Sequence, residues 1–292
     1  MRIIVTGASG RLGSVLVDRL VRLGRHEVRA WSGTTEGTRG RIPLRPVDLA
    51  DARAVDGALD EDDPGAILHA GCLSTAEAVR REPERARAVN VEATWRLAQW
   101  ASARGRRLVF TSTDLVFDGS RSWYREDDPA RPVLAYGQTK LDAEAHVAAS
   151  PGGLVARLSL LFGAPASAAP DFFAQALATL RRGEPRSFFV DEFRTPLPYS
   201  AAAEALLRLV ESDATGIVHL GGRERLSRFD LMRRAAAASG IDPALVLPGR
   251  RADAALAEPR PADVSLDTTR LDGLFPDLER PPVAAVVAAG SS

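Results

Sequence analysis

A tyrosine and a lysine four residues apart are the side chains of this sequence best suited to acid–base chemistry. Tyr136 and Lys140 occur in YGQTK, and a spacing of four places them on one face of a helix. Lys140 is the only lysine among 38 basic residues, the others being arginine. Because lysine is a compact point charge and arginine is a planar fork, the retention of one lysine indicates that this position requires an ammonium group.

The chemistry open to this pair is proton transfer to a carbonyl oxygen. Free tyrosine has a pKa of about 10, whereas acid–base catalysis at neutral pH favours a pKa near 7, a difference worth roughly 4 kcal/mol. We expect the Lys140 ammonium, and any positively charged ring bound beside it, to lower the pKa of Tyr136. Thr113 ends the segment FTST, and its hydroxyl could hold the carbonyl oxygen toward Tyr136, with Thr111 and Ser112 as competing candidates.

Three glycines near the N-terminus form a second candidate site. Gly7, Gly10 and Gly13 occur in TGASGRLG, between an apolar run at 2–6 and an amphipathic run at 12–23. In a strand–turn–helix unit, such glycines permit a tight turn, the close approach of a pyrophosphate and close packing of the helix on the strand. The helix N-terminus adds backbone N–H groups for the phosphates. The sequence therefore predicts a dinucleotide site.

The choice between NADP(H) and NAD(H) depends on the end of the second strand. An NAD-binding strand usually ends in an acidic residue that holds the ribose, but this one ends AWSG at 30–33. Arg11 follows the second glycine, and Arg39 and Arg41 lie just beyond the strand. Because arginines suit a 2′-phosphate, the sequence favours NADP(H), with NAD(H) as the alternative.

Strands that alternate with helices must position these groups. This pattern predicts an α/β protein with a Rossmann-type doubly wound parallel sheet. We expect a cofactor-binding domain at 1–162 and a smaller mixed α/β lobe for the substrate at 163–292, from which a strand near 216–220 could return to the main sheet. The tail 282–292 is expected to fray. Strands are expected at 2–6, 27–31, 42–47, 66–70, 107–111, 154–158, 187–190 and 217–220, and helices at 12–23, 51–59, 84–103, 134–149, 171–182, 200–212 and 227–239.

The overall composition narrows the class of protein. The 292 residues are 45% hydrophobic and 26% charged, with 38 basic and 38 acidic side chains, which is typical of a globular protein without a general attraction to nucleic acid or membranes. A single cysteine, Cys72, excludes an intrachain disulfide, and with no signal peptide expected we predict a cytoplasmic protein. The four histidines are not spaced as metal ligands, so no metal site is expected.

These motifs together resemble the dTDP-4-dehydrorhamnose reductase family of extended short-chain dehydrogenases/reductases. The similarity spans almost the whole chain, and the segment 111–144 is its most specific part. It implies that Thr113, Tyr136 and Lys140 form the catalytic set, and that the reaction reduces the 4-keto group of a dTDP-linked deoxysugar. The matching stretches are VTGASGRLG, RPVDLAD, ILHAG, AVNVEAT, FTSTDLVFDG, YREDDPARPVLAYGQTKLDAE, DEFRTPLPYS and RPADVSLDTTRL.

The resemblance also implies which residues contact the ligands. Asn90 is implied to lie beside the active-site strands, and Asp48 to contact the adenine. Asp48 could also cap the helix expected at 51–59, since the two roles are compatible. The residues expected to contact the cofactor are Gly7, Ser9, Gly10, Arg11, Leu12, Gly13, Asp48, Leu49, Ala70, Gly71, Asn90, Tyr136 and Lys140. Those expected to contact a nucleotide-sugar substrate are Cys72, Asp114, Leu160, Phe193 and Arg194.

Two departures from the family pattern bear on the substrate. The family often has a tryptophan after the sixth strand that stacks on the sugar, where this chain has Leu160. The segment usually read as Asp-x-x-Gly-x-Pro is DEFRTP at 191–196, so Arg194 replaces a glycine. Arg194 could bind a diphosphate or a carboxylate, or could fill the pocket.

Two further functions are compatible with the sequence. A non-catalytic, NADP-sensing regulatory subunit would be similar to the β subunit of methionine adenosyltransferase, which resembles these reductases. A reductase or epimerase of another nucleotide sugar would share the fold and differ in the pocket. A homodimer is also compatible with the fold.

Overall fold

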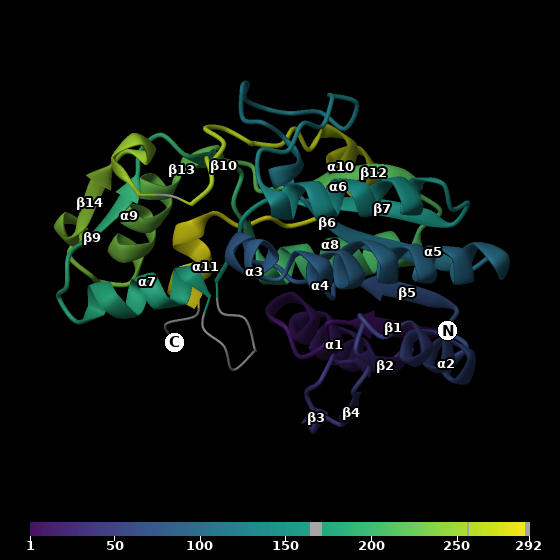
Figure 1. Ribbon diagram of the computed structural model, residues 1–292. Coiled ribbons are helices and arrows are strands. Elements are labelled where there is room, and N and C mark those ends of the chain that lie inside the picture. The colour runs from purple at the N-terminus through teal and green to yellow at the C-terminus, as the bar shows by residue number, and fades with distance from the viewer. Residues whose placement is uncertain (164–170, 256, 290–292) are drawn as a thin grey trace.

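The core of the molecule is an eight-stranded, mostly parallel sheet (Figure 1). The structure is a computed structural model, and it describes residues 1–163, 171–255 and 257–289. Neighbouring strands of the sheet pair in parallel except at one edge, where β3 runs antiparallel to β4. The predicted α/β class with a Rossmann-type sheet is confirmed. In sheet order, the strands are β12 (Gly216–Leu220), β7 (Gly153–Leu158), β6 (Arg107–Thr113), β5 (Ala66–His69), β1 (Arg2–Thr6), β2 (Glu27–Trp31), β4 (Ile42–Arg45) and β3 (Thr38–Arg39).

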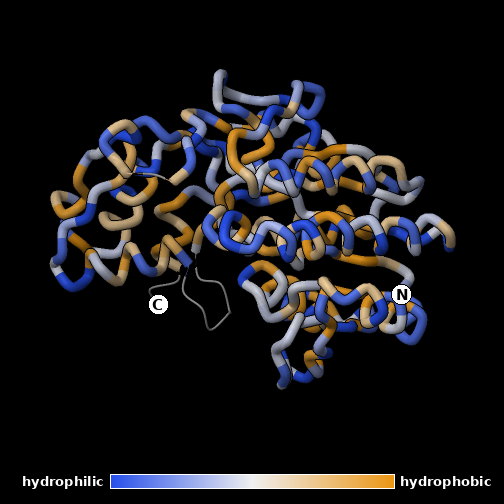
Figure 2. The backbone as a smooth tube through the Cα atoms, in the orientation of Figure 1, coloured by the Kyte–Doolittle hydropathy of each residue, from blue (hydrophilic) through white to orange (hydrophobic). Residues whose placement is uncertain are grey.

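Continuous apolar runs place these strands in the interior. Every residue of β5 and β7 is buried, and the strands between the helical layers are largely hydrophobic (Figure 2). A parallel strand that is buried on both faces needs helices on both sides of the sheet. One face is covered by α1 (Arg11–Leu23), α8 (Tyr199–Glu211) and α10 (Thr269–Leu274), and the other by α2 (Ala52–Asp62), α5 (Ala93–Ala103) and α6 (Ala135–Ala148).

Helix α1 illustrates how the local pattern fixes this packing. Leu16, Val17 and Leu20 recur at helical spacing and are fully buried against the sheet. Complete burial of one such side chain contributes about 1.5–3 kcal/mol. The helix ends at Gly24, whose φ of +66° lets its N–H donate to the carbonyl of Leu20.

The helical tract expected at 84–103 is present, but it is interrupted. It consists of α4 (Pro83–Arg87), a π-helical turn at Ala88–Glu92 and α5. A π-helical turn inserts one extra residue into the helix and is frequent at functional sites. Asn90 lies in this turn and is almost fully buried. A further short helix, α3 (Ala76–Arg81), precedes α4 and was not expected from the sequence.

A smaller lobe packs beside the carboxyl ends of the strands (Figure 1). Its core cluster includes Phe173, Phe188 and Met232, separate from the clusters on the sheet. The expectation that the tail frays is wrong for the described residues, because Val283 and Val287 of α11 are buried in this same cluster. The elements of the lobe are α7 (Phe172–Arg181), β9 (Arg186–Phe189), β10 (Phe193–Arg194), β13 (Leu226–Ser227), α9 (Arg228–Ala238), β14 (Val246–Gly249) and α11 (Val283–Ala289).

The chain passes between the sheet and the lobe more than once. After the first lobe strands, β11 (Leu197–Pro198) pairs with β8 (Leu161–Phe162) and leads into α8 on the main sheet. Strand β12 then joins the sheet edge beside β7 before the chain re-enters the lobe. The expected return of a strand near 216–220 to the main sheet is thus found. Helix α8 also packs with residues 1–162, although it lies within the range expected for the substrate lobe.

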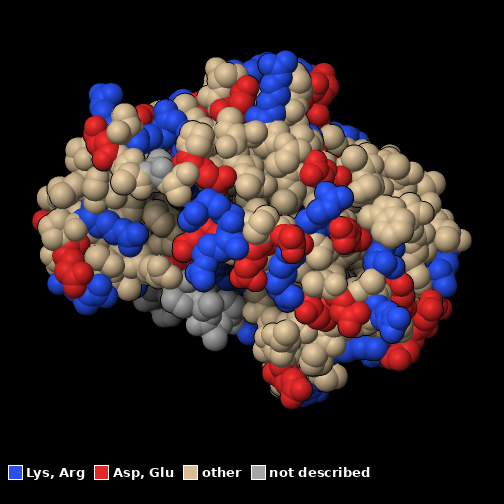
Figure 3. Space-filling model, viewed as in Figure 1, with Lys and Arg blue, Asp and Glu red and all other residues tan. Residues whose placement is uncertain are grey.

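Acidic and basic side chains are intermixed over the face shown in Figure 3. Many arginines there pair with carboxylates across neighbouring helices, as Arg96 does with Asp56 and Arg104 with Asp60. Among the described helices, none has the length and apolar character needed to cross a membrane.

Candidate active site

A cavity of about 1050 Å³ opens at the carboxyl ends of the central strands. Its walls come from the glycine loop after β1, the turns after β2, β5, β6 and β7, the start of α6, and the first residues of α7 and α9 in the lobe. Ligands of open α/β sheets bind at this edge. The volume is slightly above the roughly 300–1,000 Å³ that is typical of small-molecule sites.

The glycine loop has the geometry of a phosphate cradle. Gly7 has a φ of +66°, and a Cβ atom on it would lie 2.7 Å from the Cα atom of Gly71. A Cβ atom on Gly13 would lie 2.1 Å from the carbonyl oxygen of Gly7. No side chain caps the start of α1, which leaves its backbone N–H groups and the positive end of its dipole available to an anion. These features fit the pyrophosphate of a dinucleotide.

The adenosine end of the cavity differs from the expectation in two respects. Arg39 donates to Asp18 and, like Arg41, is not among the lining residues. Arg80 and Arg85 line this end instead, and Arg85 pairs with Asp48 at 3.2 Å.

Asp48 itself lines the cavity and accepts a hydrogen bond from the N–H of Ala50. Its interpretation as a helix cap is wrong, because α2 begins at Ala52 and its N-cap is Asp51. The carboxylate of Asp51 accepts from the N–H groups of Arg53 and Ala54, which satisfies two otherwise free donors of the first turn.

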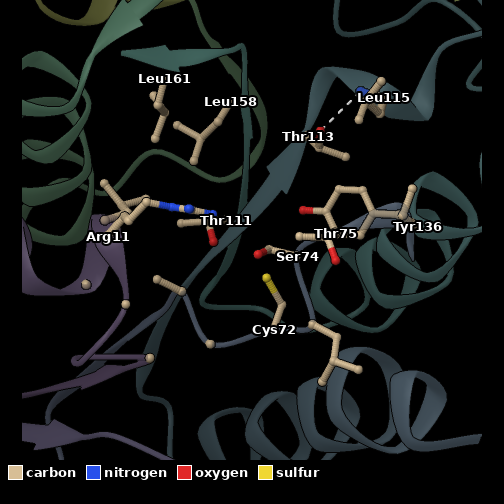
Figure 4. Close-up of a pocket in the computed structure, with 18 of the residues that line it drawn as sticks. Arg11, Cys72, Ser74, Thr75, Thr111, Thr113, Leu115, Tyr136, Leu158 and Leu161 are labelled. Carbon is tan, nitrogen blue, oxygen red and sulfur yellow. Dashed lines mark hydrogen bonds between the residues drawn. The ribbon is translucent and has the colours of Figure 1, made fainter. Parts of the chain in front are cut away.

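Tyr136 and Thr113 face the same space. Figure 4 shows the phenol of Tyr136 directed into the cavity, across from Thr113 and beside Cys72 and Thr75. The Thr113 hydroxyl accepts from the N–H of Leu115 at 3.2 Å and lies 3.3 Å from a carboxylate oxygen of Asp114. Both residues line the same cavity.

Lys140 lies one turn behind Tyr136 and does not line the cavity. Its side chain is 2% exposed, and its Nζ atom lies 4.0 Å from the centroid of the Phe110 ring. A buried ammonium over an aromatic face gains a cation–π interaction, in partial exchange for lost hydration.

The electrostatics of this group differ from the expectation. Burial raises the pKa of Tyr136 well above its usual value, and Cys72 and Asp114 act in the same direction. Burial also lowers the pKa of Lys140, although Cys72 and Glu144 oppose that shift. This direction is opposite to the one expected from the sequence, because burial removes the phenolate from water. A phenol with a raised pKa keeps its proton at neutral pH and is a weaker acid than free tyrosine.

Asn90 does not line the cavity, but its side chain connects two segments that do. Its side-chain oxygen accepts from the N–H of Leu73 at 2.8 Å, and its amide nitrogen donates to the carbonyl of Leu73 at 3.1 Å. The same nitrogen donates to the Thr139 hydroxyl at 3.0 Å. Asn90 thus joins the turn after β5 to helix α6.

The other residues expected at the cofactor line the cavity, and so do most of those expected at the substrate. Phe193 is the exception among the substrate residues, because its ring lies under the guanidinium of Arg225 at 3.7 Å and outside the lining. The expected residues that line the cavity are Gly7, Ser9, Gly10, Arg11, Leu12, Gly13, Asp48, Leu49, Ala70, Gly71, Cys72, Thr113, Asp114, Tyr136, Leu160 and Arg194.

Arg194 belongs to a buried ion network that the sequence did not reveal. It donates to Asp114 at 2.7 Å and to Glu192 at 3.3 Å. Glu192 is fully buried and also pairs with Arg228 at 2.9 Å and Arg260 at 3.6 Å. Burial raises the pKa of Glu192, but the three guanidinium groups outweigh it and hold that pKa at about 2. Arg228 and Arg260 line the cavity together with Arg194.

No group of three histidine, cysteine, aspartate or glutamate side chains within the described ranges is arranged to hold a metal ion.

Comparison with known proteins shows to which family this chain is related. Residues 1–286 match the model of the RmlD substrate binding domain. A probable low-salt glycan biosynthesis reductase of Haloferax volcanii is 30% identical over 277 residues, covering 94% of this chain and 92% of that protein. Methionine adenosyltransferase 2 subunit beta of Pongo abelii is 27% identical, covering 94% and 82% of the two chains.

Solved structures agree with this relationship. A hypothetical dTDP-4-dehydrorhamnose reductase from Sulfolobus tokodaii superimposes with a TM-score of 0.85 at 29% identity, covering 97% of this chain and 98% of that one. A dTDP-4-dehydrorhamnose reductase from Bacillus anthracis in complex with NADP has a TM-score of 0.86 at 21% identity, covering 99% and 97%. The chain therefore belongs to the RmlD substrate binding domain family, a family of NAD(P)-dependent oxidoreductases of the extended short-chain dehydrogenase/reductase type.

Proposed function

We propose that this protein reduces the 4-keto group of a nucleotide-linked deoxysugar, with NADP(H) as the preferred cofactor. The observation that carries this proposal is the convergence of the Tyr136 and Thr113 hydroxyls on one cavity that also contains the glycine loop. The similar reductases from Haloferax volcanii and Sulfolobus tokodaii support the reaction class.

In this mechanism, Tyr136 is the general acid. The chemistry supplied by the bound cofactor is transfer of a hydride to the carbonyl carbon. Tyr136 donates its proton to the carbonyl oxygen, which gives the alcohol and leaves a phenolate. Tyr136 is protonated before this step, and the positive charge of Lys140, one helical turn away, would stabilise the phenolate that follows.

Thr113 orients the substrate. Its hydroxyl can turn from Asp114 toward the carbonyl oxygen, because Asp114 has other partners in Arg194 at 2.7 Å and Ser159 at 3.1 Å. A donor placed where negative charge develops stabilises the transition state more than the ground state.

The preference for NADP(H) is supported by the end of β2. The cavity there is lined by Ser32, Gly33 and Thr34, with no carboxylate to repel a 2′-phosphate or to bind a free 2′-hydroxyl. Arg11 is the arginine of the glycine loop that lines the cavity. NAD(H) is the alternative, and the ratio of the two dissociation constants distinguishes them.

Leu160 and Arg194 are the positions that would set the sugar. Both line the cavity, where family members often have tryptophan and glycine. A reductase or epimerase of another nucleotide sugar would use the same Thr113, Tyr136 and Lys140 with a different fit at these two positions.

A regulatory subunit is the second candidate, favoured by the similarity to the methionine adenosyltransferase subunit. It would bind the cofactor and show no turnover. A homodimer is compatible with either function and is measured by light scattering.

One experiment separates these functions. NADPH and NADH are titrated first, and a dTDP-4-keto-6-deoxysugar is then added while absorbance is followed at about 340 nm. We expect absorbance loss that disappears in Tyr136→Phe, with cofactor affinity of that variant unchanged within about threefold. Cofactor binding without absorbance loss would favour another carbonyl substrate or the regulatory function, and an active Tyr136→Phe variant would refute the mechanism.

A further inference from the structure

His69, at the end of β5, has both ring nitrogens engaged in the protein interior. The residue is 1% exposed, and its ring stacks on Phe110 with centroids 5.4 Å apart. Its Nδ1 atom lies 2.7 Å from the Thr6 hydroxyl, and its Nε2 atom lies 2.9 Å from the Thr94 hydroxyl. The ring therefore links β1, which leads into the glycine loop, to α5, which follows the π-helical turn.

The hydrogen bonds around His69 determine where its proton lies. The Thr94 hydroxyl donates to the carbonyl of Asn90 at 2.7 Å, so its oxygen must accept from an Nε2–H group. The Thr6 hydroxyl oxygen already accepts from the N–H groups of Ala70 at 3.1 Å and Gly71 at 2.9 Å. Both of its lone pairs are used, so its own proton goes to Nδ1.

The opposite tautomer cannot satisfy this network. An Nδ1–H group would be a third donor to the Thr6 oxygen, and the Thr6 proton would lose its acceptor. An unprotonated Nε2 would also take the Thr94 proton away from Asn90. Burial, together with the smaller effect of the Lys140 charge, lowers the pKa of His69 to about 3, so the ring is neutral under ordinary conditions.

Each end of this network touches one half of the cavity. At the Thr6 end, Gly71 is so close to the glycine loop that a Cβ atom on Gly7 would lie 2.7 Å from the Cα atom of Gly71. At the Thr94 end, Asn90 holds Leu73 and the hydroxyl of Thr139. That hydroxyl donates to the carbonyl of Tyr136 at 2.8 Å.

We propose that His69, held as the neutral Nε2–H tautomer, is a positioning residue that fixes the glycine loop relative to the tyrosine-bearing helix α6. The role in turnover rests on the reductase function proposed above, whereas the role in loop geometry does not. Loss of the imidazole would leave two buried hydroxyls with unmade hydrogen bonds and would loosen both halves of the cavity together.

Two variants of His69 and one matched control test this proposal. His69→Phe keeps a ring next to Phe110 but removes both hydrogen bonds, whereas His69→Asn supplies one donor and one acceptor. The control is His219→Phe, because His219 is also a buried histidine with a pKa lowered by burial, but its ring contacts the carbonyls of Tyr124 and Asp267 instead of the Thr6 and Thr94 hydroxyls.

We expect His69→Phe to weaken NADPH binding and to lower kcat, each roughly tenfold. His69→Asn should restore most of both losses. His219→Phe should lose stability while its kcat and NADPH affinity stay within about threefold of the wild type. A folded His69→Phe variant with wild-type kcat and NADPH affinity would overturn the proposal.

Two measurements keep the proposal testable if His69→Phe does not fold or if the reductase function is wrong. Nitrogen NMR of the wild-type histidines should find the proton of His69 on Nε2, and a proton on Nδ1 would overturn the proposal. Amide hydrogen exchange without ligand should be faster in His69→Asn than in wild type at both 70–73 and 134–140, and no difference at either segment would contradict the proposal. A His69→Asn change confined to one of these segments would contradict the coupling, whatever the substrate.

Discussion

The Nη1 atom of Arg194 lies 2.7 Å from Oδ1 of Asp114, a residue 80 positions earlier that directly follows Thr113. This ion pair is buried at the end of β6, with 6% and 3% of the two side chains exposed. It joins the lobe to the end of the strand that carries Thr113. Arg194 thus replaces a family glycine with a charged side chain whose charge is already balanced by Asp114 and Glu192.

Removal of Arg194 should destabilise the protein. Arg194→Ala leaves Asp114 buried without its cationic partner, which costs about 3–5 kcal/mol for a buried pair. Chemical denaturation followed by circular dichroism measures this loss. Arg182→Ala is the control, because the pair of Arg182 with Glu184 is exposed and its loss should leave stability unchanged within error. Equal stability of Arg194→Ala and wild type would show that the pair does not hold the lobe.

A methyl group at Gly13 should disable the phosphate cradle. Gly13→Ala places a Cβ atom 2.1 Å from the carbonyl oxygen of Gly7, so the loop must move. We expect the dissociation constant for NADPH to rise at least roughly tenfold by calorimetric titration. Gly57→Ala is the matched control, since that position in α2 has open space around it. The control should keep its affinity and gain about 0.5–1 kcal/mol in unfolding free energy.

Acid should weaken the fold through Glu192. The folded-state pKa of Glu192 is about 2, below the usual 4.5, so the unfolded chain binds the proton more readily. The stabilisation is therefore complete above about pH 5 and is lost as pH falls toward 2, with a size of about 3 kcal/mol. Unfolding free energies of wild type and Glu192→Gln, measured from pH 3 to 7, should converge at low pH. Parallel curves would contradict this assignment.

An arginine should not replace Lys140. The lysine is 2% exposed and its Nζ atom lies 4.0 Å from the Phe110 ring, which leaves little room for a planar guanidinium. We expect Lys140→Arg to lower kcat by at least roughly tenfold and to lower the melting temperature. Arg96→Lys, at a partly exposed pair with Asp56, is the control and should leave kcat unchanged. Retention of kcat in Lys140→Arg would show that charge alone suffices.

The sequence by itself determined the features that depend on short-range periodicity. The glycine spacing at 7–13, the four-residue spacing of Tyr136 and Lys140, and the alternation of apolar strands with amphipathic helices are local patterns. Each predicts a geometry because a helix or strand repeats its side-chain directions within a few residues. Family resemblance then implied the reaction class, which the family match supports.

Tertiary structure alone decided what depends on distant partners. The pairing of Arg194 with Asp114, the three arginines around Glu192, and the packing of α8 on the main sheet join segments far apart in sequence. Burial, which cannot be read from a local sequence pattern, raises the pKa of Tyr136. The folded interior also brings the hydroxyls of Thr6 and Thr94 to the ring of His69. Desolvation and hydrogen-bond satisfaction are properties of the folded interior, so they can be determined only from the tertiary structure around these residues.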